Sequence, residues 1–195
     1  MKDLNLESIR KKLLRAWVRA RLAGHSASAR KKASLRIART VLSLAAYRRA
    51  KTVLGFVSLP TEVDTAPILK NALKQGKTLV LPFVDLENKE LKLFTVADLK
   101  TGLKRGPLGV RQPDPARAKP ARLSDIGFML VPGLAFDRSH RRLGRGGGFY
   151  DRLLKKRPGR TAAVSPAFSF QVFTNVPHEK HDQTVGRVVT EKEMF

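Results

Sequence analysis

Three short apolar runs constrain the fold of this chain more than any other feature of its sequence. They are TVLGFVSL at 52–59, TLVLPFV at 78–84 and IGFMLV at 126–131. Each run is almost continuously apolar, which indicates a strand that is buried on both faces. Strands of this kind occur in parallel sheets whose two faces are covered by helices, so the runs predict an α/β fold.

Segments with helical periodicity lie around and between the apolar runs. Apolar residues recur every three or four positions over 6–22 and again over 28–44, and Gly24 separates the two segments. We expect further helices at 66–74 and 149–156, further strands at 90–96, 160–164 and 185–190, and a long loop at 101–124. The alternation predicts a three-layer, Rossmann-like, open and mostly parallel sheet with helices on both faces and an N-terminal helical pair.

Length and composition indicate one globular domain. The 195 residues are 42% hydrophobic and 28% charged, which is ordinary for a globular protein. We expect a single monomeric domain over 1–195, in which helices within 1–45 pack on an α/β core at 50–191. The sequence has no cysteine, which excludes disulfides and zinc–thiolate sites. It shows neither a secretory signal nor an apolar run near the roughly 18 residues of a membrane span, so we expect a cytoplasmic protein without a membrane partner.

The net charge of +23 is the most unusual number in the composition. Lys and Arg number 39 against 16 Asp and Glu, and no acid occurs from Ser8 to Thr61. Such a field attracts anions, which include nucleic acid, nucleotide phosphates and polycarboxylate substrates, whereas solvated helix faces explain most of these residues equally well. An RNA-binding module is an alternative function, but aromatic residues make up only 7% and show no ladder on which bases could stack. Nucleic acid is therefore not the partner that we expect.

The segment VPGLAFDRSHRRLGRGGGFYDRLL at 131–154 carries the strongest functional signal. It predicts a strand, a glycine-rich loop and the start of a helix, and glycines in such a loop let backbone N–H groups approach an anion closely. Arg142 and Arg145 suit phosphate oxygens, and Asp151 in the first helical turn either caps the helix or holds a Mg²⁺. The pattern predicts a triphosphate site, and the alternative is a glycine-rich hinge with surface arginines. It is neither a Walker A loop nor the dinucleotide-binding G-x-G-x-x-G pattern.

The run RLGRGGGFYDR, preceded by VPGLAFD, resembles the signature of the 5-formyltetrahydrofolate cyclo-ligases, also called methenyltetrahydrofolate synthetases. Further segments resemble the same family in the same order: KKLLR at 11–15, FVSLPTEVDT at 56–65, AFSFQ at 167–171, HD at 181–182 and VVTE at 188–191. The similarity runs from about Lys11 to Glu191 and so covers nearly the whole chain.

The resemblance implies an enzyme that converts 5-formyltetrahydrofolate to 5,10-methenyltetrahydrofolate with ATP as co-substrate and Mg²⁺ as cofactor. In this reaction the formyl oxygen is phosphorylated, N10 attacks the activated carbon, and phosphate leaves. Catalysis then consists mainly of positioning and of neutralising charge. The basic surface would also suit the anionic glutamate tail of a polyglutamylated folate.

The resemblance also implies roles for individual residues. The expected ATP-binding residues are Lys11, Lys12, Arg15, Arg142, Leu143, Gly144, Arg145, Gly146, Gly147, Gly148, Phe149 and Tyr150. The expected folate-binding residues are Val57, Glu62, Arg145, Gly146, Gly147, Gly148 and Phe149, and Asp151 is the expected Mg²⁺ ligand. We assign catalysis to Arg145, which would stabilise the transferring phosphoryl group, and to Tyr150, which would face the substrate. Each assignment has a structural alternative. Tyr150 is equally well explained as a core residue, Lys11 and Arg15 as part of an exposed basic face, and Glu62 as the cap of a turn.

Three positions depart from the family pattern. Gly186 stands where the family usually has an Asp that makes a second contact to Mg²⁺, so either Asp182 or water takes its place or the affinity for the metal falls. Phe149 replaces the first tyrosine of a pair, and Gly147 stands where some relatives have Lys. These departures motivate a second hypothesis, a weakened relative that binds folate or nucleotide without turnover.

Overall fold

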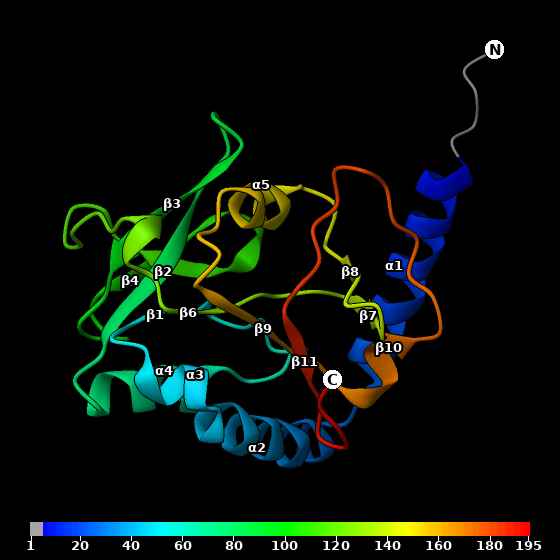
Figure 1. The fold of residues 1–195 in the computed structure, drawn as a ribbon, viewed down its shortest axis with the longest axis horizontal. Coiled ribbons are helices and arrows are strands. Elements are labelled where there is room, and N and C mark those ends of the chain that lie inside the picture. Colours follow the sequence, from blue (N-terminus) through cyan, green and yellow to red (C-terminus); the bar gives the residue numbers. More distant parts are fainter. Residues whose placement is uncertain (1–5) are drawn as a thin grey trace.

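The computed structural model describes residues 6–195 and contains an α/β sheet flanked by helices (Figure 1). The α-helices are α1 (Leu6–Gly24), α2 (Ala27–Ser43), α3 (Ala45–Arg49), α4 (Ala66–Lys74) and α5 (Phe149–Lys155). The strands are β1 (Thr52–Leu54), β2 (Thr78–Asp85), β3 (Glu90–Thr95), β4 (Leu103–Arg105), β5 (Arg111–Pro113), β6 (Phe128–Leu130), β7 (Ala135–Asp137), β8 (Arg142–Leu143), β9 (Ala162–Pro166), β10 (Val172–Phe173) and β11 (Arg187–Val189). Short 3₁₀ turns, η1 (Pro107–Gly109), η2 (Leu123–Asp125) and η3 (Ser169–Gln171), complete the described elements.

The central sheet has the strand order β11-β9-β6-β1-β2-β3. Neighbouring strands are parallel from β11 to β2, and only the edge strand β3 runs antiparallel to its neighbour β2. The predicted open and mostly parallel sheet is therefore confirmed. Its strand order reverses between β1 and β6, and parallel sheets bind their ligands at the carboxyl ends of strands that flank such a reversal.

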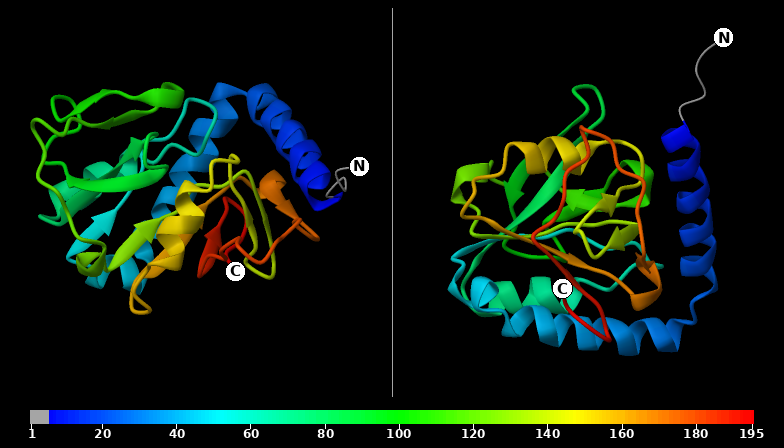
Figure 2. Two further views of the ribbon diagram at one scale, coloured as in Figure 1. Left: turned by 90° about the horizontal axis from the view of Figure 1, so that it is seen from above. Right: turned by 45° about the vertical axis from the view of Figure 1, so that its right-hand side comes forward.

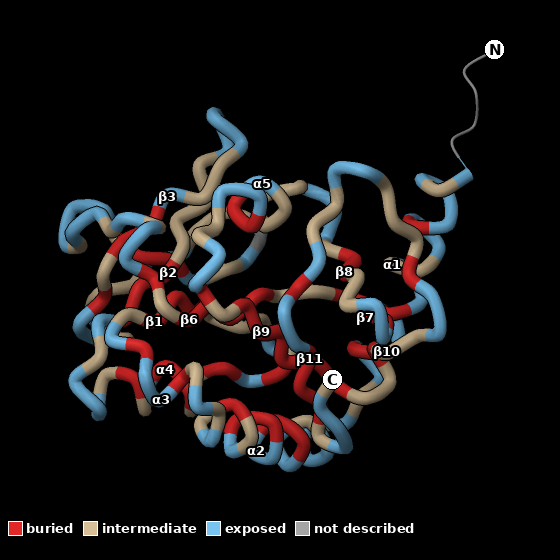
Figure 3. Tube along the Cα trace, in the orientation of Figure 1, coloured by how far each residue is buried: buried red, intermediate tan, exposed pale blue. Residues whose placement is uncertain are grey.

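Two hydrophobic cores cover the two faces of the sheet, which explains why the predicted strands are apolar at successive positions. Val53 of β1 packs in one core with residues of α2 and α4, and its neighbour Leu54 packs in the other core with Leu153 and Leu154 of α5. In Figure 1, α2, α3 and α4 lie on one side of the sheet and α5 lies on the other. Buried residues concentrate in the strands and on the inward sides of the helices (Figure 3).

The N-terminal helices pack on this framework at different places. Val18 and Leu22 of α1 and Ile37 of α2 are fully or almost fully buried in the same core. Ser26 separates the two helices and caps α2, because its Oγ accepts a hydrogen bond from the Ala29 N–H at 3.3 Å. Figure 2 shows α1 along one edge of the molecule, running in a different direction from α2.

Some predicted boundaries are wrong for a local reason. The strand predicted at 52–59 ends at Leu54, because the backbone beyond it bonds to side chains of its own loop. The Thr65 hydroxyl donates to the Phe56 carbonyl at 2.6 Å, and the Leu59 N–H donates to Glu62 Oε2 at 2.9 Å. The segment after β1 therefore leaves the sheet and becomes part of a loop at its carboxyl edge.

The predicted loop at 101–124 contains a hairpin, and several short elements were not predicted. Strands β4 and β5 pair antiparallel within that segment. A separate three-stranded sheet, in the order β10-β7-β8, occupies part of the region predicted as a glycine-rich loop. These strands have two or three residues each, too few to show a periodicity in the sequence. Within residues 6–195, the structure has no helix that is long and apolar enough to cross a membrane.

Candidate functional site

A small hollow lies at the carboxyl ends of β1, β6 and β9, where the strand order reverses. Its lining residues come from the loops that follow these strands and from η3: Phe56, Glu62, Val63, Pro132, Gly133, Pro166 and Gln171. Glu62 is the acid among them, and it was one of the two predicted folate-binding positions outside the glycine-rich loop. The topology therefore brings the FVSLPTEVDT segment and the VPG segment, which are far apart in sequence, to one edge of the sheet.

The glycine-rich loop has a backbone shape that requires glycine at two positions. Gly146 has φ +113° and Gly148 has φ +65°, and L-residues with a side chain rarely adopt such values. Gly148 is also the residue that precedes α5, so the left-handed turn sets the direction in which this helix leaves the loop. Residues 145–147 are exposed, as a loop that binds a soluble anion needs to be.

Arg145 of the glycine-rich loop forms an ion pair with Glu62, which lines the hollow. Its Nη2 lies 2.5 Å and its Nε 3.1 Å from Glu62 Oε1. The second oxygen of Glu62 accepts the hydrogen bond from the Leu59 backbone, so the carboxylate is fixed from both sides. The structure thus brings together the residue predicted to stabilise the phosphoryl group and the residue predicted to bind the pterin.

Arg142 and Asp151 form a second ion pair beneath the loop. Arg142 is buried, its Nη2 lies 2.5 Å from Asp151 Oδ1, and its Nη1 donates to the Pro132 carbonyl at 3.3 Å. The Gln183 N–H also donates to Asp151 Oδ1, at 3.2 Å. Arg142 therefore joins β8 to the first turn of α5, and its role as a direct phosphate ligand stays a prediction.

Tyr150 places a hydroxyl inside the protein beside these charges. Its side-chain oxygen is buried and has no hydrogen-bond partner among the described residues. Burial raises the pKa of the Tyr150 phenol well above its usual range, the Glu62 carboxylate raises it further, and Arg142 opposes the shift. The phenol is therefore neutral at physiological pH and can donate a hydrogen bond. The two interpretations of Tyr150, core residue and substrate-facing group, are both compatible with this position.

Two further predicted cations, Lys11 and Arg15, come from helix α1, which lies beside the glycine-rich loop. Lys11 is buried, and its Nζ lies 2.7 Å from Glu179 Oε2 and 2.5 Å from Asp182 Oδ2. Desolvation lowers the pKa of Lys11, but the hydrogen bonds to Asp182 and Glu179 outweigh it and leave the pKa raised. One turn later, Arg15 Nε donates to the Gly144 carbonyl at 3.0 Å.

The remaining predicted residues are spread around this cluster. Val57 is half-buried against the core that contains Val53, and Lys12 is exposed on α1. Leu143 is buried, and Phe149 stacks beneath the Arg152 guanidinium, whose Cζ lies 5.2 Å from the ring centroid. A Cβ at Gly147 would come within 2.7 Å of the Phe149 ring, so a Lys at this position would require the ring to move.

Gly186 and Asp182, the two positions linked to a second metal contact, have different surroundings. The Gly186 N–H donates to the Ala163 carbonyl at 3.0 Å, and a Cβ at Gly186 would lie 3.1 Å from that oxygen. Asp182 instead lies beside Lys11 and accepts the Glu179 N–H at 2.8 Å. An Asp at 186 would therefore be crowded, whereas Asp182 is already at the site.

Sequence reasoning missed Arg19, Glu179 and Gln183. The Arg19 Nη2 donates to the Arg145 carbonyl at 3.3 Å, Glu179 binds Lys11, and the Gln183 N–H binds Asp151. Glu179 and Gln183 flank the HD pair at 181–182 that drew attention in the sequence, and this proximity was the one available signal. Within residues 6–195, the structure shows no cluster of three or more acidic or histidine side chains able to hold a metal ion by themselves.

Comparison with known proteins decides the family. The sequence model of the 5-formyltetrahydrofolate cyclo-ligase family matches residues 7–191. The chain belongs to this family. The 5-formyltetrahydrofolate cyclo-ligase of Mus musculus is 31% identical over 189 residues, which cover 93% of each chain. The mitochondrial 5-formyltetrahydrofolate cyclo-ligase of Arabidopsis thaliana is 32% identical, over 95% of this chain and 76% of the relative.

Solved structures of the family have the same fold. The 5,10-methenyltetrahydrofolate synthetase of Aquifex aeolicus superposes with a TM-score of 0.81 and 34% identity, over 94% of this chain and 91% of that chain. The synthetase of Mycoplasma pneumoniae superposes with a TM-score of 0.76 over 93% of this chain and 98% of that one, but its identity is only 18%, so it supports the fold alone. The resemblance of the sequence motifs to the cyclo-ligase family is therefore confirmed by the family model and by the solved structure of 34% identity.

Proposed function

We propose that the chain is an ATP-dependent 5-formyltetrahydrofolate cyclo-ligase. The formyl oxygen on N5 attacks the γ-phosphorus of ATP and ADP leaves. The N10 nitrogen then attacks the activated formyl carbon and loses its proton, and the C–O bond breaks to release phosphate and 5,10-methenyltetrahydrofolate. The Arg145–Glu62 contact carries this proposal, because it joins the glycine-rich loop to the hollow at the strand reversal. In this proposal, a single site at this junction binds both the triphosphate and the pterin after Arg145 and Glu62 separate.

Each substrate would bind a charged side chain that pairs with another side chain in this structure. A pterin can donate paired N–H bonds to the Glu62 carboxylate, and this exchange would release Arg145 toward the transferring phosphoryl group. Phosphate oxygens can likewise replace the carboxylates of Glu179 and Asp182 around Lys11. The ion pairs keep the cations oriented before the substrates arrive, which lowers the cost of arranging them during the reaction.

Arg15 and Tyr150 would position the reacting groups. Arg15 contacts the Gly144 carbonyl and so holds the helix α1 against the loop. The neutral phenol of Tyr150 has no partner in the described structure, and a formyl or phosphoryl oxygen in the hollow would give its proton an acceptor. Leaving a buried hydroxyl unsatisfied costs about 1–3 kcal/mol, and substrate binding would remove this cost.

A magnesium ion fits the residues present if the nucleotide supplies the other ligands. Mg²⁺ in nucleotide sites is held by one or two carboxylates together with phosphate oxygens and water. Both hydrogen bonds to Asp151 use Oδ1, so Oδ2 is the oxygen that would reach the ion. Asp182 precedes Gln183, whose N–H binds Asp151, and it is the nearest candidate for a second carboxylate. When bound, the ion would neutralise phosphate charge.

The folate would carry a polyglutamate tail, and the chain would act as a cytoplasmic monomer. The net charge of +23 supports an anionic substrate, since it draws anions to the protein. Both the location and the monomeric state are proposals, and the Arabidopsis relative is mitochondrial by name.

An absorbance assay tests the proposed reaction. Purified protein with 5-formyltetrahydrofolate, ATP and Mg²⁺ is expected to produce the methenyl absorbance band, and omitting ATP or Mg²⁺ is expected to abolish it. If no band forms while ATP still binds, the chain is the weakened relative. A filter-binding assay at low salt adds the RNA comparison: RNA binding that ATP at stoichiometric concentration fails to displace would favour a general nucleic-acid surface.

A further inference from the structure

Helix α1 has a second apolar face that lies outside the buried core, although Trp17 at its C-terminal end packs edge-on against Phe173 of β10, with 5.5 Å between the ring centroids. The inward face carries Val18 and Leu22, which are buried in the core. The opposite side carries four large apolar residues at helical spacing, Leu6, Ile9, Leu13 and Trp17, whose exposed fractions are 58%, 37%, 66% and 51%. We call these four residues the outer stripe. Single exposed apolar residues are ordinary, but a row of four along one helix is a sign of an interaction surface.

Basic residues border the outer stripe on both sides. Arg10 and Arg21 lie along one side, Lys12 lies along the other, and all three are exposed. Arg19, on the same side as Lys12, instead donates to the Arg145 carbonyl at 3.3 Å. The acid of this helix, Glu7, pairs with Arg10 at 2.9 Å. An apolar row between two rows of cations is the pattern of a helix that lies in a membrane interface, with its apolar side among the acyl chains and its cations at the phosphates.

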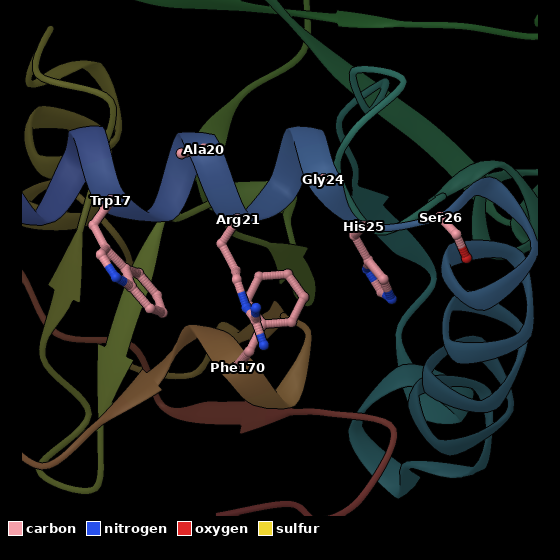
Figure 4. Close-up of a pocket in the computed structure, with 7 residues that line it drawn as sticks. All are labelled: Trp17, Ala20, Arg21, Gly24, His25, Ser26 and Phe170. Carbon is pink, nitrogen blue, oxygen red and sulfur yellow. The ribbon is translucent and has the colours of Figure 1, made fainter.

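A groove continues the outer stripe at its C-terminal end (Figure 4). It has a volume of about 580 Å³ and is lined by Trp17, Ala20, Arg21, Gly24, His25, Ser26 and Phe170. Figure 4 shows Trp17 and Arg21 pointing from α1 toward Phe170 of η3. The Arg21 Cζ lies 5.8 Å from the Phe170 ring centroid, so a cation stands at the rim of an aromatic wall. An aromatic wall with a cation at its rim suits a ligand that has an apolar hydrocarbon part and an anionic head group.

We propose that the outer stripe and its groove dock on the surface of a bilayer that contains anionic phospholipids. A second copy of the chain fits poorly, because the flanking arginines and lysines of both copies would face one another. A bound partner helix would need acids opposite the cations on both sides of the stripe, whereas an anionic bilayer presents phosphates along the whole helix. Figure 2 shows that α1 lies along one edge of the molecule.

This docking revises the expectation of a protein without a membrane partner, although it involves no membrane span. No helix in the described part of the chain can cross a membrane, and an interfacial helix needs to be embedded only about 5–10 Å. The substrates would bind on the other side of α1, since Lys11 and Arg15 point toward the loop and the C-terminal segment. The proposal is therefore independent of the catalytic activity, and its failure would leave the proposed function intact.

The chain offers a built-in reporter for the test. Trp17 is the single tryptophan, and it lies on the outer stripe. We expect vesicles of phosphatidylcholine with phosphatidylglycerol to shift Trp17 emission to shorter wavelength and to sediment the protein. Vesicles of phosphatidylcholine alone are expected to do neither. Sedimentation without an emission shift would mean that charge alone binds the protein, and it would overturn the proposal.

Matched substitutions separate apolar docking from charge. Leu13→Gln keeps the net charge and is expected to weaken binding about fivefold, the effect of removing one apolar side chain from the interface. Leu86→Gln is the control, because Leu86 is 55% exposed in the turn between β2 and β3, away from α1. Equal affinities for the two variants would overturn the proposal. An emission shift that grows with protein concentration without vesicles would also overturn it and would favour pairing of two copies.

Discussion

Arg145 and Glu62, which are 83 positions apart in the chain, form an ion pair with 2.5 Å between Nη2 and Oε1. Arg145 belongs to the glycine-rich loop, and Glu62 belongs to the loop that follows β1. Glu62 was expected to bind the folate, whereas Arg145 was expected to border both substrates and to act on the transferring phosphoryl group. Because these side chains are in contact, we expect the pterin and phosphate subsites to adjoin and both side chains to exchange partners when the substrates bind.

Replacing Glu62 by Gln tests the folate end of this pair. The amide has one acceptor and no charge, so it cannot replace the carboxylate that would receive two N–H bonds from the pterin. We expect the KM for 5-formyltetrahydrofolate to rise at least tenfold, while the KM for ATP changes less than threefold. Glu87→Gln, in the exposed turn between β2 and β3, is the control for loss of one negative charge. A larger effect on ATP than on folate would contradict the assignment.

Replacing Arg145 by Ala tests the phosphoryl end. An arginine that contacts charge developing in the transition state affects mainly kcat, and removal of such a donor costs about a hundredfold to a thousandfold. We expect a loss of this size in kcat with a smaller change in the KM for ATP. Arg117→Ala, at an exposed position near β5, removes the same charge far from the loop. Unchanged turnover of Arg145→Ala would show that another cation acts on the phosphoryl group.

The outline of the fold was predictable because it depends on local patterns. The apolar runs of β1, β2 and β6 and the periodicity of α1, α2 and α4 give the strands and helices directly. The contacts of the site were not predictable in the same way. The pairing of Lys11 with Asp182 joins residues 171 positions apart, and it depends on how α1 packs against the C-terminal segment. The glycine-rich loop could be located from its composition, but not the partners of its arginines.

Lys11→Met tests how α1 is held at the site. The substitution leaves Glu179 and Asp182 without the ammonium between them, and removal of one partner from a buried ion pair costs about 3–5 kcal/mol. We expect Tm to fall by about 10 °C and the KM for ATP to rise. Lys12→Met is the control for Tm only, because Lys12 is the neighbouring exposed residue and is itself an expected ATP-binding residue. Equal Tm values for the two variants would contradict the structural role of Lys11.

The same ion pair predicts a pH dependence of stability. Burial raises the pKa of Asp182, but the hydrogen bonds from Lys11 and from the Glu179 N–H outweigh burial and leave the pKa lowered. The stability that Asp182 contributes is therefore present above its unfolded pKa and is lost as pH falls through its folded pKa. The pKa of Lys11 is raised, so its contribution is present below its unfolded pKa and is lost as pH rises through the folded one. We therefore expect the Tm difference between the wild type and Lys11→Met to be largest at pH values between the pKa of Asp182 and the pKa of Lys11. Melting curves across pH measure it, and a difference that grows toward low pH would contradict the pairing.

Gly146→Ala tests whether the shape of the glycine-rich loop is needed for binding or only for folding. Gly146 has φ +113°, which alanine adopts only with strain of about 1–3 kcal/mol. Because the loop is exposed, it can relax to another conformation, so we expect Tm to fall by only a few degrees. The KM for ATP should rise at least tenfold, since the relaxed backbone no longer directs its N–H groups at the phosphates. Gly159→Ala, at a position with ordinary φ and no heavy atom within 4 Å of the added Cβ, should leave both quantities unchanged. If Gly146→Ala binds ATP as the wild type does, the backbone of this loop does not form the phosphate site.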